Sequence, residues 1–252
     1  MTNSSKMAKV LAVVAPGAQA MQISSVFSSS SYLSADLSRS FWSNTNAVPF
    51  WLASWDLNWG TDGYPHSGGV LWNYAAFSNW EIHEKIKIDF TRWGTQWGVF
   101  DVTNTEIAIM MCKAALFQDR AAFDNLKAAE QQFQVHIAAN QNNWAVFSKH
   151  MAAQHLLDAK KFGRGVTGFT NAKWDANVMH IAKHVLTAKF TQIQRYGQLL
   201  LGTDDKVLVE AAPRDPNWGA NMSAAEIRTG MFANPNTSFA WPGKNMLGAT
   251  LM

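Results

Sequence analysis

The stretch Thr103-Asn-Thr-Glu-Ile-Ala-Ile-Met-Met-Cys-Lys-Ala-Ala-Leu-Phe117 contains both the start signal and the apolar period of a helix. Thr103 and Glu106 have the Ser/Thr-x-x-Glu spacing of a capping box, in which each side chain bonds the other residue's backbone amide. Apolar side chains then recur every three or four residues, at Ile107, Met110, Met111, Ala114 and Phe117. The stretch therefore predicts a helix with an apolar face.

Further helices are predicted on its C-terminal side, at about residues 121–135, 144–160 and 172–201. The second of these is expected to stop before Gly163, and the last, as one helix or two, to end at Gly202. Residues 206–210 are the best strand, and the capping box at 223–226 opens a short helix. The predicted fold class is mainly α (α+β) with a small β element.

The N-terminal third of the chain has a different composition. The first 40 residues are rich in serine and carry a single acid, Asp36, which resembles an organelle transit peptide; a short secretory signal and a retained arm are the alternatives. Eight of the twelve tryptophans lie within 42–97, among turn-forming residues. We predict a Trp-rich irregular extension over 1–85 and a domain over 86–252. The 42–97 arm would cover the chain's own second half, dock on another protein, or stack single-stranded nucleic acid.

Composition narrows the class of protein. The 252 residues are 48% hydrophobic and 15% charged, so the chain is neither disordered nor fibrous. A net charge of +3 is too small to argue for nucleic-acid binding, and the low charge density favours a surface covered by partners. Cys112 is the only cysteine, which excludes a disulfide framework and a Cys-based zinc site. No apolar run approaches the roughly 18 residues that a membrane span needs.

Familiar catalytic and metal-binding motifs are missing from the sequence. It contains neither a Gly-rich phosphate loop of standard spacing nor a Gly-x-Ser-x-Gly elbow. His180 and His184 have the spacing of a zinc-binding pair, but Ile181 stands where the general-base Glu would be, and no third ligand is evident. We therefore expect two half-solvated helical histidines, an inert buried Cys112 thiol, no metal and no cofactor.

A series of short motifs follows one another along the second half of the chain, at 95–97, 106–117, 159–169, 174, 188–203, 207–219, 234–235 and 243–248. The most diagnostic is Val207-Leu-Val-Glu-Ala-Ala-Pro-Arg-Asp-Pro-Asn-Trp-Gly219, a strand and the loop after it. In content and order these motifs resemble the NADAR (YbiA-like) family over residues 86–252. The resemblance implies a compact helical domain of that family, with the Trp-rich extension added before it.

The same resemblance implies hydrolysis of an N-glycosidic bond. Members of the family act on ribosylamino-pyrimidine phosphates or remove ADP-ribose from guanine in nucleic acid, so the implied partner is a phosphorylated ribosyl or ADP-ribosyl molecule. By motif position the catalytic residues would be Glu106, Asp215 and Trp174. Substrate contacts would come from Lys113, Arg164, Lys189, Trp218 and Asn245. Nucleic acid enters only as a possible substrate.

Several departures from the family pattern support a second hypothesis. Ile107 follows the motif Glu where members usually carry His or Gln, and Ala212 precedes Pro213 in place of Ser. The segment between residues 119 and 160 is longer than in the compact form. Polar pocket positions are thus lost while structural ones remain. The alternative is a catalytically inactive NADAR-fold subunit of a larger protein complex, for which the transit-like start would suit an organelle such as the mitochondrion.

Single residues also have plain structural alternatives. Glu106 would act only within its capping box, and Asp215 only as a turn residue that bonds its own backbone. Trp218 would belong to the core. Lys189 would extend its stem over apolar surface and keep its ammonium in water.

Overall fold

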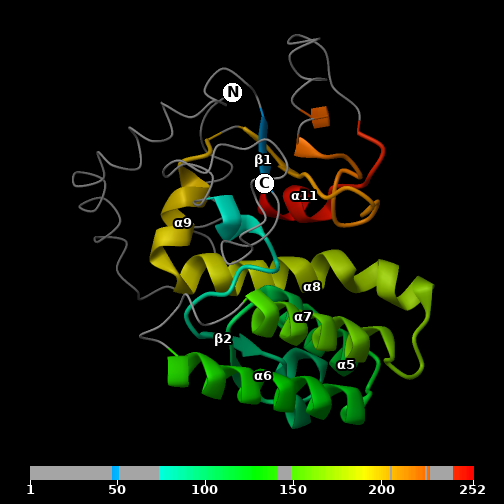
Figure 1. The fold of residues 1–252 in the computed structure, drawn as a ribbon. Helices are drawn as coiled ribbons and strands as arrows, with labels where there is room; N and C mark the ends of the chain where they lie inside the picture. Colours follow the sequence, from blue (N-terminus) through cyan, green and yellow to red (C-terminus); the bar gives the residue numbers. More distant parts are fainter. Residues whose placement is uncertain (1–46, 51–73, 141–148, 205, 225, 228–240) are drawn as a thin grey trace, which may run out of the picture. The chain divides into compact units, whose positions relative to one another are not determined.

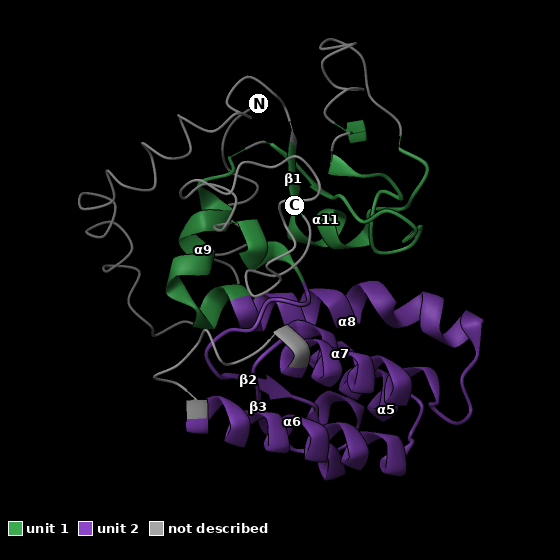
Figure 2. Ribbon diagram, in the orientation of Figure 1, with its two compact units in different colours: residues 1–51, 59–78, 190–252 green, residues 52–58, 79–189 purple. Residues whose placement is uncertain are grey.

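The computed structural model describes residues 47–50, 74–140, 149–204, 206–224, 226–227 and 241–252. This part of the chain is mainly helical with short strands, which confirms the predicted fold class (Figure 1). Most of the predicted extension, the start of the helix expected from residue 144 and the 234–235 motif lie outside it. The chain divides into two compact units, coloured green (unit 1) and purple (unit 2) in Figure 2.

Unit 2 contains a hairpin and the helices of the first motifs. Its elements are β2 (Ile86–Asp89), η3 (Thr91–Trp93), η4 (Thr95–Trp97), β3 (Val99–Val102), α5 (Thr105–Leu116), α6 (Arg120–Asn140), α7 (Lys149–Arg164) and α8 (Asn171–Gln192) up to Lys189. β2 and β3 pair antiparallel with Ile86 opposite Val102. Ile86 and Ile88 are buried whereas Lys87 and Asp89 are exposed, the alternation of a half-buried strand. This hairpin is absent from the sequence prediction.

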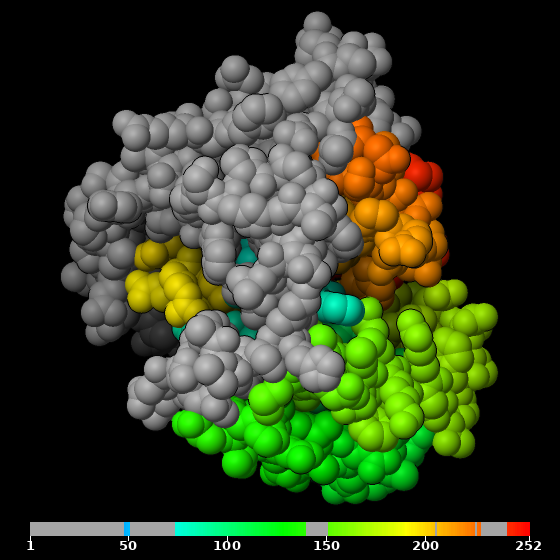
Figure 3. All heavy atoms as spheres, in the orientation of Figure 1, coloured from blue at the N-terminus to red at the C-terminus, as the bar shows by residue number. Residues whose placement is uncertain are grey.

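Helix α5 lies at the centre of unit 2, where it packs against both α6 and α7. Every one of its residues except Met110 is buried, so the helix is covered on all sides rather than on the single face that its period predicts. A helix that is apolar nearly all round belongs inside a protein. Helices α6 and α7 pack against each other as well, and both contribute to the face shown in Figure 3.

Gly163 has a different role from the predicted helix stop. Helix α7 continues through it to Arg164. A Cβ atom at Gly163 would lie 2.1 Å from Met110 Sδ and 3.0 Å from Met110 Cβ. The glycine therefore permits the close approach of α7 to α5, and the prediction that it ends the helix is wrong.

Unit 1 is built around a pair of parallel strands. Its described elements are β1 (Ala47–Phe50), η2 (Ala75–Phe77), the end of α8 from Phe190, α9 (Gln194–Leu201), β4 (Val207–Glu210) and α11 (Met246–Leu251). Ala47 of β1 is opposite Val207 of β4. The predicted strand at 206–210 is confirmed. The stretch 172–201, expected as one helix or two, forms two, and the second ends at Leu201 with Gly202 as its C-cap, as predicted. The second capping box is confirmed too, since the amide of Ser223 donates to Glu226 Oε2 at 2.7 Å.

Helix α11 is fastened to β4 by its first residues. Asn245 is 2% exposed; its Nδ2 donates to the Leu208 carbonyl, and its Oδ1 accepts from the Glu210 amide, both at 2.9 Å. Its backbone is left-handed, with φ of 49°, a conformation that Asn tolerates better than most residues. A Cβ on Gly248 would lie 2.0 Å from the Leu208 carbonyl oxygen. The contact between α11 and β4 therefore depends on the side-chain amide of Asn245 and on the absence of a side chain at Gly248.

We expect Gly248→Ala to lower the free energy of unfolding by about 3 kcal/mol, because the new methyl group meets a backbone oxygen that cannot rotate away. Urea denaturation of the purified protein measures this loss. Gly165→Ala is the matched control: its Cβ would meet backbone oxygens at an ordinary 3.5 Å, so the change should stay within about 1 kcal/mol. Equal losses in the two variants would contradict the close packing of α11 on β4.

Candidate active site

The eight residues suggested by the motifs are divided between the two units. Glu106, Lys113, Arg164, Trp174 and Lys189 belong to unit 2. Asp215, Trp218 and Asn245 belong to unit 1. Each group has its own internal contacts.

Glu106 is the second residue of α5 and is only 8% exposed. The helix is capped by Asn104, whose Oδ1 accepts from the Ile107 amide at 2.9 Å. The Glu106 amide donates to the Asn79 carbonyl at 3.0 Å, and the Thr105 hydroxyl to Asn79 Oδ1 at 2.9 Å. A carboxylate in this first turn lies at the positive end of the helix dipole, which favours its charged form.

The Thr103–Glu106 capping box is a wrong prediction. The Thr103 amide and hydroxyl both donate to Glu130 Oε1 at 2.8 Å, so neither is available to Glu106. The N-cap is the next residue, Asn104, which also belongs to the residue types that cap helices. The structural alternative for Glu106, a role limited to that box, is removed with it.

Lys113 lies on the same stripe of α5 as Glu106, because seven residues make almost two full turns, about 10 Å along the helix. Its ammonium donates to the Gly163 carbonyl at 2.7 Å. The same nitrogen lies 4.2 Å from the ring centre of Phe169 and 5.3 Å from that of Trp174. Burial, and then the positive charge of Arg164, lower the pKa of Lys113 from its usual value. Unit 2 thus brings Lys113, Arg164 and Trp174 together.

The loop that carries Phe169 is held by Asp119 at the start of α6. Asp119 Oδ1 accepts from the Ala122 amide at 2.9 Å, and Oδ2 from the Thr167 amide at 2.7 Å. Burial acts to raise the pKa of Asp119, but these amide hydrogen bonds outweigh it, and the pKa falls below its usual value of 3.8. The charged carboxylate therefore joins a helix cap to the loop beside Lys113.

We expect Asp119→Asn to lower the free energy of unfolding by about 1 kcal/mol at neutral pH. Asparagine keeps the cap through its oxygen but turns an NH2 group toward the Thr167 amide. Because the carboxylate's contribution is present above pH 3.8 and is lost as pH falls through its lowered folded pKa, the difference from wild type should vanish in acid. Urea denaturation at pH 7 and in the acid range measures it; a difference that persists in acid would contradict the role of the charge.

Lys189 is fully buried, with no exposed surface. The prediction that it reaches water from its helix is therefore wrong: the side chain points into the protein. Burial lowers its pKa from 10.5 to about 7, against the opposing effect of Glu81, whose negative charge favours the ammonium. Glu81 is itself 6% exposed. Unit 2 thus holds a lysine that can lose its proton near neutral pH.

In unit 1 the motif residues form the turn after β4. Asp215 Oδ1 accepts from the amides of Asn217 and Trp218, at 3.1 and 2.9 Å, which confirms the predicted turn bonding. Its Oδ2 has no hydrogen-bond partner among the residues that the structure describes. Trp218 is half-buried. Both ends of the Asn245 amide are engaged on β4, as described above.

The metal-binding residue types do not gather in the described ranges, where no group of three or more His, Cys, Asp or Glu side chains could hold an ion. His180 is exposed; His184 Nε2 donates to the Asp89 carbonyl at 2.8 Å, and the ring meets Trp93 edge to face. Cys112 is free and buried, and burial raises its pKa well above the usual value. Within the same ranges, no helix is both long and apolar enough to cross a membrane.

Sequence reasoning missed the residues that hold the first turn of α5. Asn79, Asn104, Glu130 and His155 come from four separate segments, so no local spacing links them. Asn104 alone had a usable signal, since Asn before an apolar period is a common N-cap.

Comparison with known proteins gives two matches. A family model described as "NADAR domain" matches residues 70–252. N-glycosidase R617 of Acanthamoeba polyphaga mimivirus is 32% identical over 130 residues, which cover 52% of this chain and 73% of that protein.

Proposed function

Because the chain belongs to the NADAR family, we propose that it is an N-glycosidase, which hydrolyses the bond between a ribose and a base. The substrate classes proposed are ribosylamino-pyrimidine phosphates and ADP-ribosyl-guanine. One observation carries the proposal. A buried carboxylate at the start of α5, Glu106, shares a helix stripe with Lys113, whose ammonium lies 5.3 Å from the ring of Trp174.

This set of groups suits the chemistry of the reaction. The bond between the ribose C1′ and the base nitrogen breaks, water supplies the oxygen that bonds to C1′, and the departing base takes up a proton. The sugar passes through an oxocarbenium-like state, which a nearby carboxylate stabilises or supplies with an oriented water. Glu106 is proposed for that role. Its burial excludes water that would otherwise weaken the attraction between carboxylate and developing positive charge.

The remaining residues of unit 2 are proposed as substrate contacts. The indole of Trp174 offers an aromatic face on which a base can stack. Burial and, to a smaller extent, repulsion by Arg164 lower the pKa of Lys113, and a bound phosphate would relieve the repulsion between the two cations. Lys189 would supply a further cation when protonated.

The three motif residues of unit 1 are proposed as further parts of the site from their positions in the family motif. Asp215 is the proposed second acid, supported by an Oδ2 atom to which no described residue donates. Trp218 and Asn245 are proposed to line the substrate pocket. Since the Asn245 amide already bonds β4, its contact with substrate would come through the remaining lone pair of Oδ1 or the second N–H of Nδ2.

A single-turnover assay tests the proposal. Purified protein in excess is mixed with a ribosylamino-pyrimidine phosphate or with ADP-ribosylated guanine in DNA, and free base or free ADP-ribose is followed by chromatography. Release from either substrate supports the N-glycosidase and selects its class. If neither substrate releases its product and the protein unfolds cooperatively, the N-glycosidase proposal is contradicted and the non-catalytic subunit is favoured.

A further inference from the structure

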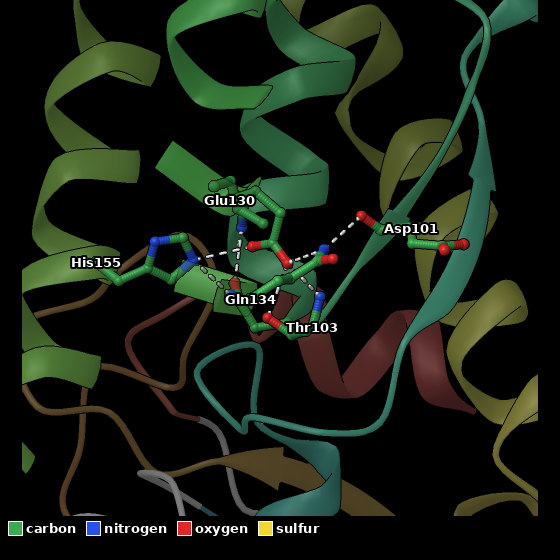
Figure 4. Close-up of polar contacts among 7 residues, drawn as sticks. Asp101, Thr103, Glu130, Gln134 and His155 are labelled. Carbon is green, nitrogen blue, oxygen red and sulfur yellow. Dashed lines mark hydrogen bonds and ion pairs between the residues drawn. The ribbon is translucent and has the colours of Figure 1, made fainter. Parts of the chain in front are cut away.

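A second buried carboxylate, Glu130 of α6, lies outside the motif residues and is 2% exposed. Figure 4 shows its contacts with α7 and with the turn between β3 and α5. Oε1 accepts from the Thr103 amide and hydroxyl at 2.8 Å and from Gln134 Nε2 at 2.9 Å. Oε2 lies 3.0 Å from His155 Nε2. Burying a charge is costly unless it is hydrogen-bonded, and both oxygens of Glu130 meet that condition.

The imidazole of His155 connects this carboxylate to the N-cap of α5. Its Nε2 also lies 3.1 Å from Asn104 Nδ2, while Asn104 Oδ1 accepts from the Ile107 amide. The ring is held flat against Phe133, with centroids 4.0 Å apart and planes 7° apart. A ring nitrogen offers either one N–H or one lone pair. Because an ionised carboxylate accepts but does not donate, a charged Glu130 makes Nε2 the donor, and Asn104 Nδ2 then finds no lone pair on that nitrogen.

We propose that Glu130 and His155 are positioning residues that set the place of the Glu106 carboxylate through the Thr103–Asn104 turn. This inference rests on the proposed function for the role of Glu106. Glu130 holds residue 103, His155 faces residue 104, and Glu106 follows two residues later in the first turn of α5. Helices α6 and α7 thus fix the start of the central helix α5.

The first variant is Glu130→Gln, which keeps the shape of the side chain. Its new NH2 group can bond His155 Nε2 only if that nitrogen presents its lone pair, for which Asn104 Nδ2 would compete, so the surroundings of the N-cap residue change. We expect kcat to fall about 10- to 100-fold while KM stays within about twofold, the pattern of a misplaced reacting group rather than of lost binding. Asp124→Asn, an exposed carboxylate on the same helix paired with Arg120, is the matched control and should keep wild-type kcat.

A pocket of about 260 Å³ gives a second test, because Glu130 lies in its wall together with Lys87, Asp101 and Lys127. A small carboxylate could enter it and replace a deleted side chain. In Glu130→Ala, added formate should restore kcat at least several-fold, and chloride at equal ionic strength should not. Loss of kcat in both Glu130 variants together with restoration by formate supports a positioning carboxylate. Unchanged kcat in Glu130→Gln, or a loss in Glu130→Ala that formate and chloride affect equally, overturns it.

Hydrogen exchange at the Ile107 amide separates this proposal from the proposed function. That amide is capped by Asn104, so Glu130→Gln should speed its exchange about tenfold while the amides of residues 114–116 at the far end of α5 keep wild-type rates. If the wild type cleaves neither substrate, the glycosidase proposal fails, yet faster exchange at Ile107 would still support positioning of this turn. Unchanged exchange at Ile107 overturns the positioning role whatever the activity.

Discussion

Glu106→Gln is expected to lower the single-turnover rate of base release by about 10³-fold, which lies within the range that a positioned acid or base contributes to catalysis. Glutamine has nearly the same shape, and the backbone bond from residue 106 to the Asn79 carbonyl stays available. The variant lacks only the negative charge that would stabilise the oxocarbenium-like sugar. Rate constants at saturating enzyme measure the loss, because they exclude product release.

Two comparisons make this result specific to position 106. Asp158→Asn removes a carboxylate from the exposed side of α7, where it bonds only Gln154 among the described residues, and should keep the wild-type rate. Urea denaturation should place Glu106→Gln within about 1 kcal/mol of wild type, the usual size of a helix-dipole interaction. A rate that stays within threefold of wild type, in protein of wild-type stability, would contradict a catalytic Glu106.

Local signals predicted the helices and one strand, because each depends on residues close in sequence. The apolar period of α5 and the turn residues after β4 could be found by spacing alone. The partner of β4 could not: β1 pairs with it across 160 residues, and Pro49 in the middle of β1 argues against a strand. The β2–β3 hairpin was missed because its short strands mix apolar with charged residues, whereas β4, which is equally short, has an apolar run at 207–209.

The candidate site was predictable only as a set of residue types. The motifs named Glu106, Lys113 and Trp174, but spacing could not show that the Lys113 ammonium lies near two aromatic rings or that it donates to the Gly163 carbonyl. Nor could it identify Glu130 and His155, which meet only because α6 and α7 pack side by side. Interactions that depend on tertiary packing leave no period in the sequence.

Lys189 shows most clearly what the sequence could not predict. The sequence places this lysine on a helix, but only the structure shows that its side chain has no exposed surface. Its folded pKa of about 7 lies well below the unfolded value of 10.5, so between these values the unfolded chain binds a proton that the folded chain does not. Stability must then rise with pH over that interval, by about 1.4 kcal/mol per pH unit. Below pH 7 both states are protonated and the full cost of the buried charge remains.

We therefore expect the unfolding free energy of wild type, relative to Lys189→Met, to increase by on the order of 4 kcal/mol between pH 7 and pH 10.5. Urea denaturation at half-unit pH steps measures the difference, in which contributions common to both proteins cancel. The slope of this free-energy difference against pH is the measured test of the low Lys189 pKa. The difference at any single pH is not, because Lys189→Met also leaves Glu81 without its positive partner. Lys183→Met, an exposed lysine on the same helix, should follow wild type at every pH.

Glu81→Gln tests whether the negative charge of Glu81 raises the pKa of Lys189, opposite to the effect of burial. The carboxylate of Glu81 raises the pKa of Lys189, so its removal should lower that pKa further and move the onset of the rise in stability below pH 7. Parallel pH curves for wild type and Lys189→Met would contradict a buried, readily deprotonated lysine. A curve for Glu81→Gln that starts to rise at higher pH than that of wild type would contradict the favourable effect of Glu81 on the ammonium, because losing a favourable partner cannot raise the pKa of Lys189.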